Sequence, residues 1–167
     1  TCVSVGGRGG RGADVISDVG CRYTLCFVAI PVGPYYREGL TAIDGLVLDG
    51  YGRAAPGGVG HVKAAGNYGA DILPSIEAKR QGYPISLYLD TVENKYIEEF
   101  NVSNFIGISA DGSTFVTPDS PSVLPSITNR MLQKLALTMG MKVEVRPVTI
   151  DECADFSEVA GCGTAVR

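Results

Sequence analysis

The stretch SITNRMLQKLALTMGMKVEVR, residues 126–146, decides the fold class. Apolar residues recur every three or four positions between Ser126 and Gly140, which predicts an amphipathic helix with a serine N-cap and a glycine stop. Residues 142–146 then alternate charged side chains with two valines, a pattern typical of a strand. A helix that leads directly into a strand indicates a domain in which helices pack on a sheet.

The rest of the chain continues this mixture of elements. A second helix is predicted over residues 64–81, with basic residues in its last turn and Gly82 as its stop. Three of its residues are expected on the buried face: Ile72, Ile76 and Ala78. Further strands are predicted over residues 22–32, 40–49, 85–89, 95–97, 103–108 and 157–160. The strand at 22–32 is expected to be well buried, and the fold class is α+β (mixed α/β).

The composition excludes several classes of function. Of the 167 residues, 45% are hydrophobic and 19% are charged, which is typical of a globular chain of one domain. The 14 basic and 18 acidic residues give a formal net charge of −4, so no basic field is available to attract nucleic acid. The longest apolar run, residues 25–32, is too short to span a bilayer. We therefore expect neither nucleic acid nor a membrane as a partner.

The cysteines and the first residues carry two further expectations. Five cysteines without a CxxC pair, and a single histidine at position 61, predict neither a metal site nor a disulfide framework. Free thiols of this kind suit a cytoplasmic or mitochondrial location. Residues 1–21 hold a Gly/Arg-rich cluster and are expected to form a mobile segment, in preference to an RNA-binding one.

A glycine-rich loop, RAAPGGVGHVK over residues 53–63, is the first candidate site. Its spacing and the alanine at position 64 exclude a Walker phosphate loop, which needs Ser or Thr after the lysine. Glycines around one lysine suit a backbone that lies close to a flat ligand while a buried amine attacks a carbonyl. A surface lysine in a flexible loop is the alternative interpretation.

Two other groups of residues could carry chemistry. Glu98 and Glu99 are neighbours on an extended segment, so their side chains face opposite sides and cannot share a proton. A solvated strand end is the alternative explanation for them. The helix that begins after Ser126 offers free N–H groups and a positive dipole end to a phosphate, although simple capping also explains Ser126 and Thr128.

Taken together and in this order, these segments resemble the branched-chain amino acid aminotransferases, which are pyridoxal-phosphate enzymes of fold type IV. The similarity covers roughly residues 22–165. It is carried by RAAPGGVGHVK at 53–63 with Asn67-Tyr68, YIEE at 96–99 with Asn104-Phe105, TP at 117–118, LPSIT at 124–128 and GTA at 163–165. Residues 96–104 look most like those of filamentous-fungal members.

The resemblance implies an architecture. Residues 53–167 would form an incomplete large C-terminal domain that binds the cofactor. Residues 22–52 would form the last strand of the small domain and the interdomain linker. The rest of the small domain and the strands that follow position 165 in the family are not part of this sequence, so we expect a fragment with reduced or no activity alone.

The resemblance also implies a role for each site residue. Lys63 would form the Schiff base with pyridoxal 5′-phosphate and move the proton during catalysis. Glu99 would keep the pyridine nitrogen protonated. The other implied cofactor contacts are Tyr68 at the ring oxygen, Arg53, Ile127, Thr128 and Thr164 around the phosphate, and Asn104. Thr164 and Ala165 would lie near the substrate carboxylate, and Ser126 replaces a glycine that is usual in the family.

The implied reaction is ping-pong amino transfer between leucine, isoleucine or valine and 2-oxoglutarate. The ligands would be small amino acids and 2-oxo acids, and the full-length enzyme would be a homodimer. Three alternatives stay open: a D-amino acid aminotransferase, an aminodeoxychorismate lyase of the same fold type, and a catalytically dead fragment that only binds the cofactor.

Overall fold

A computed structural model describes residues 2–7, 23–31 and 41–164 of the chain. It consists of two compact units, Thr1–Pro34 and Tyr35–Arg167. In the part of the chain that is described, neither helix is both long and apolar enough to pass through a membrane.

The first unit contains an antiparallel pair of strands, β1 (Cys2–Gly7) and β2 (Tyr23–Val28). Strand β1 corrects part of the expectation for residues 1–21, because alternating valines there favour pairing with β2 over a mobile segment. The remainder of that segment, residues 1 and 8–21, lies outside the described residues. Strand β2 falls where a buried strand is predicted, but residues 25–31 are exposed. A partner strand covers the edge of β2 and leaves its faces open.

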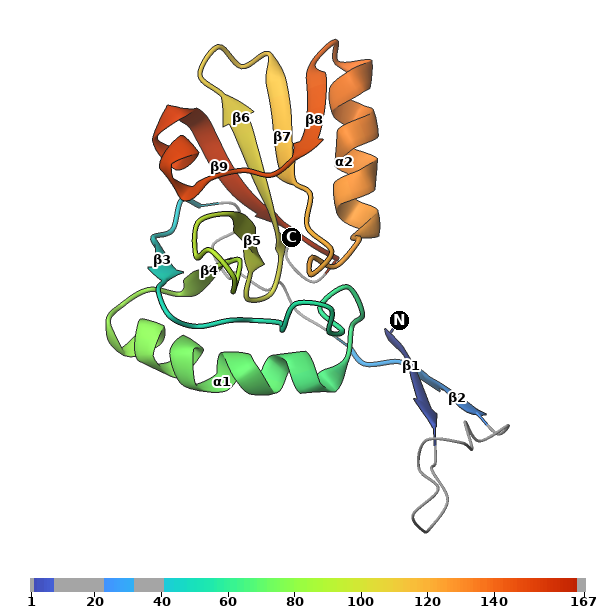
Figure 1. Ribbon diagram of the computed structural model, residues 1–167. Coiled ribbons are helices and arrows are strands. Elements are labelled where there is room, and N and C mark those ends of the chain that lie inside the picture. The colour runs from blue at the N-terminus through green and yellow to red at the C-terminus, as the bar shows by residue number, and fades with distance from the viewer. Residues whose placement is uncertain (1, 8–22, 32–40, 165–167) are drawn as a thin grey trace. The chain divides into compact units, whose positions relative to one another are not determined.

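The second unit is built on a sheet of seven strands in which the described order is β3-β4-β5-β6-β7-β8, with β9 also paired to β6 (Figure 1). Its elements are β3 (Gly45–Leu48), α1 (Ala65–Arg80), β4 (Ile85–Leu89), β5 (Ile97–Phe100), β6 (Asn104–Ser109), β7 (Thr114–Pro118), α2 (Ile127–Thr138), β8 (Lys142–Arg146), a 3-10 helix (Ile150–Asp155) and β9 (Phe156–Cys162). Strand β3 lies within the linker expected over residues 22–52. Because β3 pairs with β4, the large unit begins before Arg53.

Each helix connects two parallel strands. Helix α1 connects β3 to β4, and α2 connects β7 to β8 and packs along it (Figure 1). Parallel strands need such a crossover, whereas the antiparallel pairs β4–β5, β5–β6 and β6–β7 are joined by turns. The predicted mixed α/β architecture is therefore confirmed.

The helix ends lie where the sequence predicts them. At the end of α1, Gly82 adopts φ +93°, and the Tyr83 N–H donates to the Ala78 carbonyl at 2.9 Å, which is a Schellman arrangement. At the start of α2, the Ser126 hydroxyl accepts the Asn129 N–H at 3.3 Å. The strand predicted over residues 95–97 instead spans Ile97–Phe100. The Asp90 carboxylate accepts the N–H groups of residues 95 and 96, and Tyr96 forms only an isolated bridge with Thr149.

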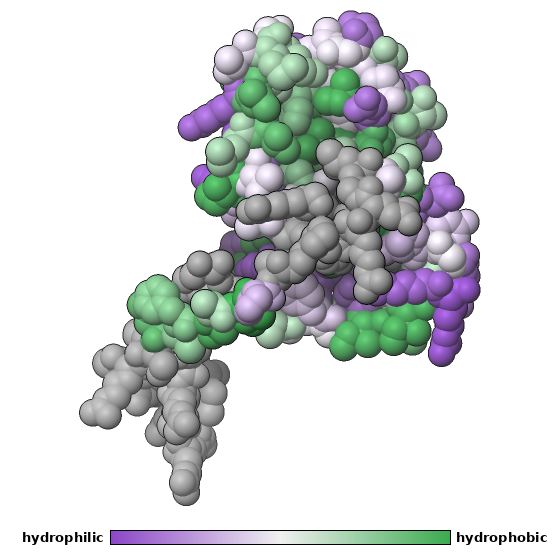
Figure 2. All heavy atoms as spheres, turned by 180° about the vertical axis from the view of Figure 1, so that it is seen from behind, coloured by the Kyte–Doolittle hydropathy of each residue, from purple (hydrophilic) through white to green (hydrophobic). Residues whose placement is uncertain are grey.

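The helices contact the sheet through small side chains. Ala78 of α1 is buried, as expected, and Ala136 of α2 is buried, although most of the apolar residues that recur along α2 are exposed. Ile72 and Ile76 are exposed, so this part of the predicted buried face is wrong. Small residues let the helix backbone approach the sheet, and the larger apolar side chains then point outward. Apolar surface is visible on the face shown in Figure 2. The larger hydrophobic cluster is formed mainly by side chains of the strands. Its buried members are Ile85, Leu87, Leu89, Ile97, Phe100, Phe105, Val116 and Val148.

Candidate active site

A buried ion pair joins the glycine-rich loop to β5. Arg53 Nη2 lies 2.8 Å from Glu99 Oε1, and the two side chains are 8% and 7% exposed. The same nitrogen donates to the Gly60 carbonyl at 3.3 Å and to the Ser122 carbonyl. Arg53 therefore connects three segments that are far apart in sequence: the loop, β5, and the connection between β7 and α2.

The second oxygen of Glu99 is held by Asn104. The two residues are paired across the tight turn between β5 and β6, and Asn104 Nδ2 donates to Glu99 Oε2 at 2.6 Å. Nδ2 also donates to the Leu124 carbonyl at 3.1 Å. Burial raises the pKa of Glu99 to about 7, although Arg53 and Asn104 favour the charged carboxylate. The carboxyl group is thus fixed in position, and Arg53 and Asn104 offset only part of the effect of its burial.

We expect Glu99→Gln to remove a pH-dependent loss of stability. The folded-state pKa of about 7 lies above the unfolded value of about 4.3. Between these values the folded state binds more protons, so the unfolding free energy of the wild type falls as pH rises from about 4.5 to 7 and stays low above it. The variant should match the wild type near pH 4.5 and exceed it by about 4 kcal/mol at pH 8. Urea unfolding across this range measures the difference, and parallel curves for both proteins would contradict the expectation.

Lys63 lies in the turn immediately before α1. The Asn67 side chain fixes this turn, because its Nδ2 donates to the carbonyls of Val59 and Val62, both at 2.9 Å. Lys63 is exposed, which differs from the buried amine considered in the sequence analysis, so an aldehyde in solution can reach it. The carbonyl of Gly60, three residues before Lys63, accepts a hydrogen bond from Arg53, which in turn pairs with Glu99.

Gly60 is packed so tightly that no side chain fits there. A Cβ at this position would overlap the Ser122 carbonyl, lie 2.7 Å from Ala54 Cβ and lie 3.1 Å from Arg53 Nη2. We expect Gly60→Ala to destabilise the chain by about 1–3 kcal/mol and to displace Arg53 from Glu99. Gly66→Ala, in the first turn of α1 where a Cβ meets nothing within 4 Å, is the matched control. Equal unfolding midpoints for the two variants would argue against this packing.

Backbone N–H groups and threonine hydroxyls form a second polar cluster at the start of α2. Within the described residues, the hydrogen bonds recorded there do not use the N–H groups of Ile127 and Thr128. The hydroxyl of Thr164 lies 3.4 Å from that of Thr128, so the segment after β9 meets the helix start. Ser126 adopts φ −63° and ψ 133°, a conformation open to any residue, so a serine in place of glycine causes no backbone strain.

The structure brings together only some of the residues singled out in the sequence. Arg53, Glu99 and Asn104 are linked as described, and Thr128 meets Thr164, whereas Lys63 is connected to them only through the loop that also carries Gly60. Tyr68 lies exposed on α1, and Ala165 is outside the described residues. Arg53, expected near a phosphate, has its recorded contacts with Glu99 and two carbonyls instead.

Sequence reasoning missed two features of the site. Glu98 and Glu99 are 4% and 6% exposed, so the alternative of a solvated strand end is wrong for both. A hydrogen-bonded chain also connects α1 to the sheet: Tyr88 Oη donates to Asp71 Oδ1 at 2.7 Å, and Ser75 Oγ donates to the same oxygen at 2.8 Å. Burial raises the pKa of Tyr88 and keeps it neutral. No motif marks these residues, because their roles depend on contacts between distant segments.

Residues 29–167 match the model of the amino-transferase class IV family, and the chain belongs to this family. The family resemblance inferred from the sequence is therefore confirmed.

Individual relatives agree with this assignment. The chain is 41% identical over 145 residues to a branched-chain-amino-acid aminotransferase of Helicobacter pylori, covering 86% of this chain and 42% of that protein. It is 42% identical over 146 residues to an aminotransferase of the fungus Gibberella zeae, covering 86% and 38%. The chain thus spans less than half the length of the curated relatives that it matches.

A solved structure extends the comparison to the fold. The branched-chain amino acid aminotransferase of Thermobaculum terrenum, solved in its PLP form, superimposes with a TM-score of 0.68 at 27% identity. The match covers 76% of this chain and 41% of that one. The expected fold type is confirmed, and the expected cofactor is the one present in that relative.

Proposed function

We propose that this chain carries the cofactor-binding core of a branched-chain aminotransferase, in which Lys63 forms the covalent bond with pyridoxal 5′-phosphate. The observation that carries the proposal is the buried Arg53–Glu99–Asn104 group, tied through Gly60 to the loop that bears Lys63. The residues fit the cofactor in chemistry: a reachable amine, a buried carboxylate that can face a ring nitrogen, and a helix start for an anionic group.

Lys63 would act first as a nucleophile. Its Nζ would hold the cofactor covalently at the aldehyde carbon, with loss of water. When it is not bound to the cofactor, the same amine would take a proton from the substrate carbon and return it. The bound cofactor supplies an electron-withdrawing ring that stabilises negative charge at that carbon.

Glu99 would hold the proton at the ring nitrogen. A carboxylate does this only while it stays ionised, and burial works against ionisation. Arg53 offsets the burial through its charge, and Asn104 offsets it by donating to the second oxygen. We therefore assign Arg53 to Glu99 in place of the phosphate contact expected from the resemblance.

The start of α2 would hold the phosphate. The N–H groups of Ile127 and Thr128 and the positive end of the helix dipole suit a dianion, and the Thr128 and Thr164 hydroxyls add two donors. Tyr68 remains our proposal for the ring oxygen, and the backbone of Thr164 and Ala165 for the substrate carboxylate.

For the complete protein we propose leucine, isoleucine or valine as amino donors, 2-oxoglutarate as acceptor, a homodimer as the assembly and a cytoplasmic or mitochondrial location. The names of the similar proteins support the donor class. These properties belong to the whole protein, because the chain spans less than half of its relatives.

A half-reaction tests the proposal on this chain. The chain is loaded with pyridoxal 5′-phosphate, freed of excess, and mixed with L-leucine, L-valine or D-alanine while absorbance follows conversion of the aldehyde form to the amine form. Conversion with the two L-amino acids supports the proposal. Conversion with D-alanine alone indicates a D-amino acid aminotransferase, and covalent loading without any conversion indicates a fragment that only binds the cofactor.

A further inference from the structure

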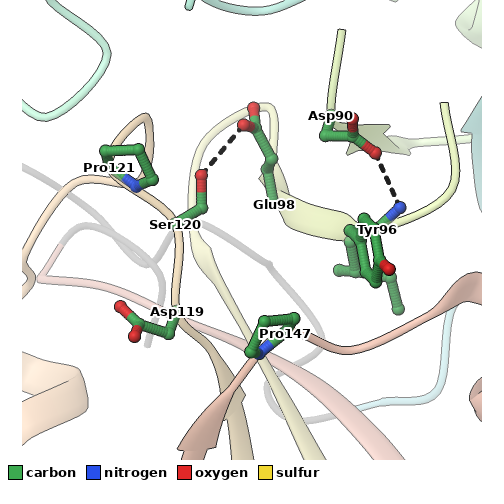
Figure 3. A pocket seen from close by; sticks show the side chains of 8 residues that line it. Asp90, Tyr96, Glu98, Asp119, Ser120, Pro121 and Pro147 are labelled. Carbon is green, nitrogen blue, oxygen red and sulfur yellow. Dashed lines mark hydrogen bonds between the residues drawn. The ribbon is translucent and has the colours of Figure 1, made fainter. Parts of the chain in front are cut away.

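Glu98 is a buried carboxyl group that the proposed chemistry leaves unused. It is the neighbour of Glu99 on β5 and points to the opposite face of the strand, where it is 4% exposed. Its Oε1 accepts the Ser120 hydroxyl at 3.0 Å, whereas Oε2 has no hydrogen-bond partner (Figure 3). An isolated carboxyl oxygen in the interior costs folding free energy, so stability alone does not explain this residue.

The pocket beside Glu98 does not supply the explanation. It has a volume of about 320 Å³ and is lined in part by Glu98, Tyr96, Asp119 and Pro147 (Figure 3). The unpartnered Oε2 is closed to solvent, so a molecule in this open pocket cannot reach it without movement of the chain. The reason for burying Glu98 therefore has to be sought at its other oxygen, Oε1, which accepts the Ser120 hydroxyl.

A continuous path of hydrogen bonds leads from Glu98 to the cofactor site. Ser120 Oγ, which donates to Glu98, accepts the Ser122 N–H at 3.2 Å. The Ser122 carbonyl in turn accepts from Arg53 Nη2, the nitrogen that lies 2.8 Å from Glu99. The connection between β7 and α2 is thus attached to β5 on both faces of the strand, by Glu98 on one side and by Arg53 with Glu99 on the other.

We propose that Glu98 is a positioning residue: through Ser120 it fixes the turn at residues 119–123, so that the Ser122 carbonyl holds the Arg53 guanidinium against Glu99. Burial raises the pKa of Glu98, although the Ser120 hydroxyl and the charge of Arg53 favour its charged form. If the turn is released, Arg53 loses one of its three acceptors and Glu99 loses the fixed charge that offsets its burial. The consequence for the cofactor rests on the proposed function, whereas the consequence for the ion pair does not.

Four variants distinguish the positioning role of Glu98 from the effect of its charge and from a general loss of stability. Glu98→Ala removes the acceptor and the charge, Glu98→Gln removes the charge and keeps an acceptor, and Ser120→Ala removes the donor and keeps the charge. The fourth is the double variant Glu98→Ala/Ser120→Ala. Glu158→Ala, an exposed glutamate on β9, is the matched control.

The first measurement uses the chain without cofactor. Carbon-detected NMR follows the titration of the Glu99 carboxyl, assigned by the loss of its signal in Glu99→Gln. We expect the midpoint in Ser120→Ala to rise above the wild-type midpoint, and the midpoint in Glu98→Ala to lie above that in Glu98→Gln. Comparison with Glu98→Gln is needed because the loss of a like charge by itself lowers the midpoint.

The second measurement is the dissociation constant of pyridoxal 5′-phosphate. Glu98→Ala and Ser120→Ala should each weaken binding about tenfold, and Glu98→Gln should stay within about twofold of the wild type. The double variant should also lose about tenfold, because both changes break the same path. Absence of a covalent bond at Lys63 in the wild type would overturn the proposed function, while the titrations would still decide this inference. Unchanged Glu99 midpoints in Ser120→Ala and Glu98→Ala, with only a lower melting temperature, would overturn the positioning role.

Discussion

Replacing Lys63 by alanine should abolish covalent attachment of pyridoxal 5′-phosphate at the glycine-rich loop. Borohydride reduces the carbon–nitrogen double bond between the lysine and the cofactor to a stable amine, so a peptide map of the reduced wild type should show a label on Lys63. The variant should show none there. The reason is chemical: the residue proposed to form the bond has been removed, and no neighbour within the loop carries an amine.

The control for this experiment is Lys79→Ala. Lys79 is an exposed lysine in the last turn of α1 and has no recorded contact with the Arg53–Glu99 pair. The Lys79→Ala variant should keep the label on Lys63 and should have the absorption spectrum of the wild type. A label divided among several lysines in the wild type, or one that survives in Lys63→Ala at the same total amount, would mean that the cofactor reacts with surface amines and not with a site.

The sequence predicts those parts of the fold that local rules determine. Ser126 caps α2 and Gly82 ends α1 because a side-chain acceptor and a positive φ are properties of single positions. The alternating valines of β8 likewise pair as a strand. Such features depend on a few neighbouring residues, so they can be inferred without knowledge of the tertiary structure.

Burial is harder to predict, because it depends on what lies across from a residue. The apolar spacing of Ile72 and Ile76 suggests a core face, yet the sheet contacts α1 through Ala78 and Ser75. Glu98 and Glu99 look like a solvated strand end, yet cations and hydroxyls from distant segments allow both to be buried. Composition and periodicity contain no information on those partners.

In the candidate site, too, some features can be predicted from local sequence and others depend on contacts between distant segments. The resemblance points to Lys63, Glu99 and the start of α2, since these positions carry motif residues, and their roles stay predictions. It gives no sign of the contacts of the Ser122 carbonyl and the Ser120 hydroxyl, because a backbone acceptor has no sequence signature and a serine is common in turns. The contact between Arg53 and Glu99 joins residues that are 46 positions apart in sequence, and only the fold brings them together.

Among the single substitutions described above, Arg53→Met should cause the largest decrease in the free energy of unfolding. Methionine keeps much of the side-chain volume but leaves Glu99 buried without its cation, and removal of one partner of a buried ion pair costs about 3–5 kcal/mol. The loss should depend on pH. Below the Glu99 midpoint of about 7 the carboxyl group is largely protonated in both proteins, so the loss should grow by only about 1.4 kcal/mol between pH 5 and 8, almost all of it above the midpoint. Urea unfolding at the two pH values measures this widening.

Two further variants show whether the effect comes from the buried pair. Arg80→Met breaks an exposed pair on α1, in which Arg80 lies 3.8 Å from Glu77, and should change the unfolding free energy by less than about 0.5 kcal/mol. Arg53→Met/Glu99→Gln removes the charge that Arg53→Met leaves unpaired, so it should recover most of the stability at pH 8. It should not recover cofactor binding, because the carboxylate proposed for the ring nitrogen is absent. Equal losses in Arg53→Met and Arg80→Met, or no recovery in the double variant, would show that the pair does not act as a unit.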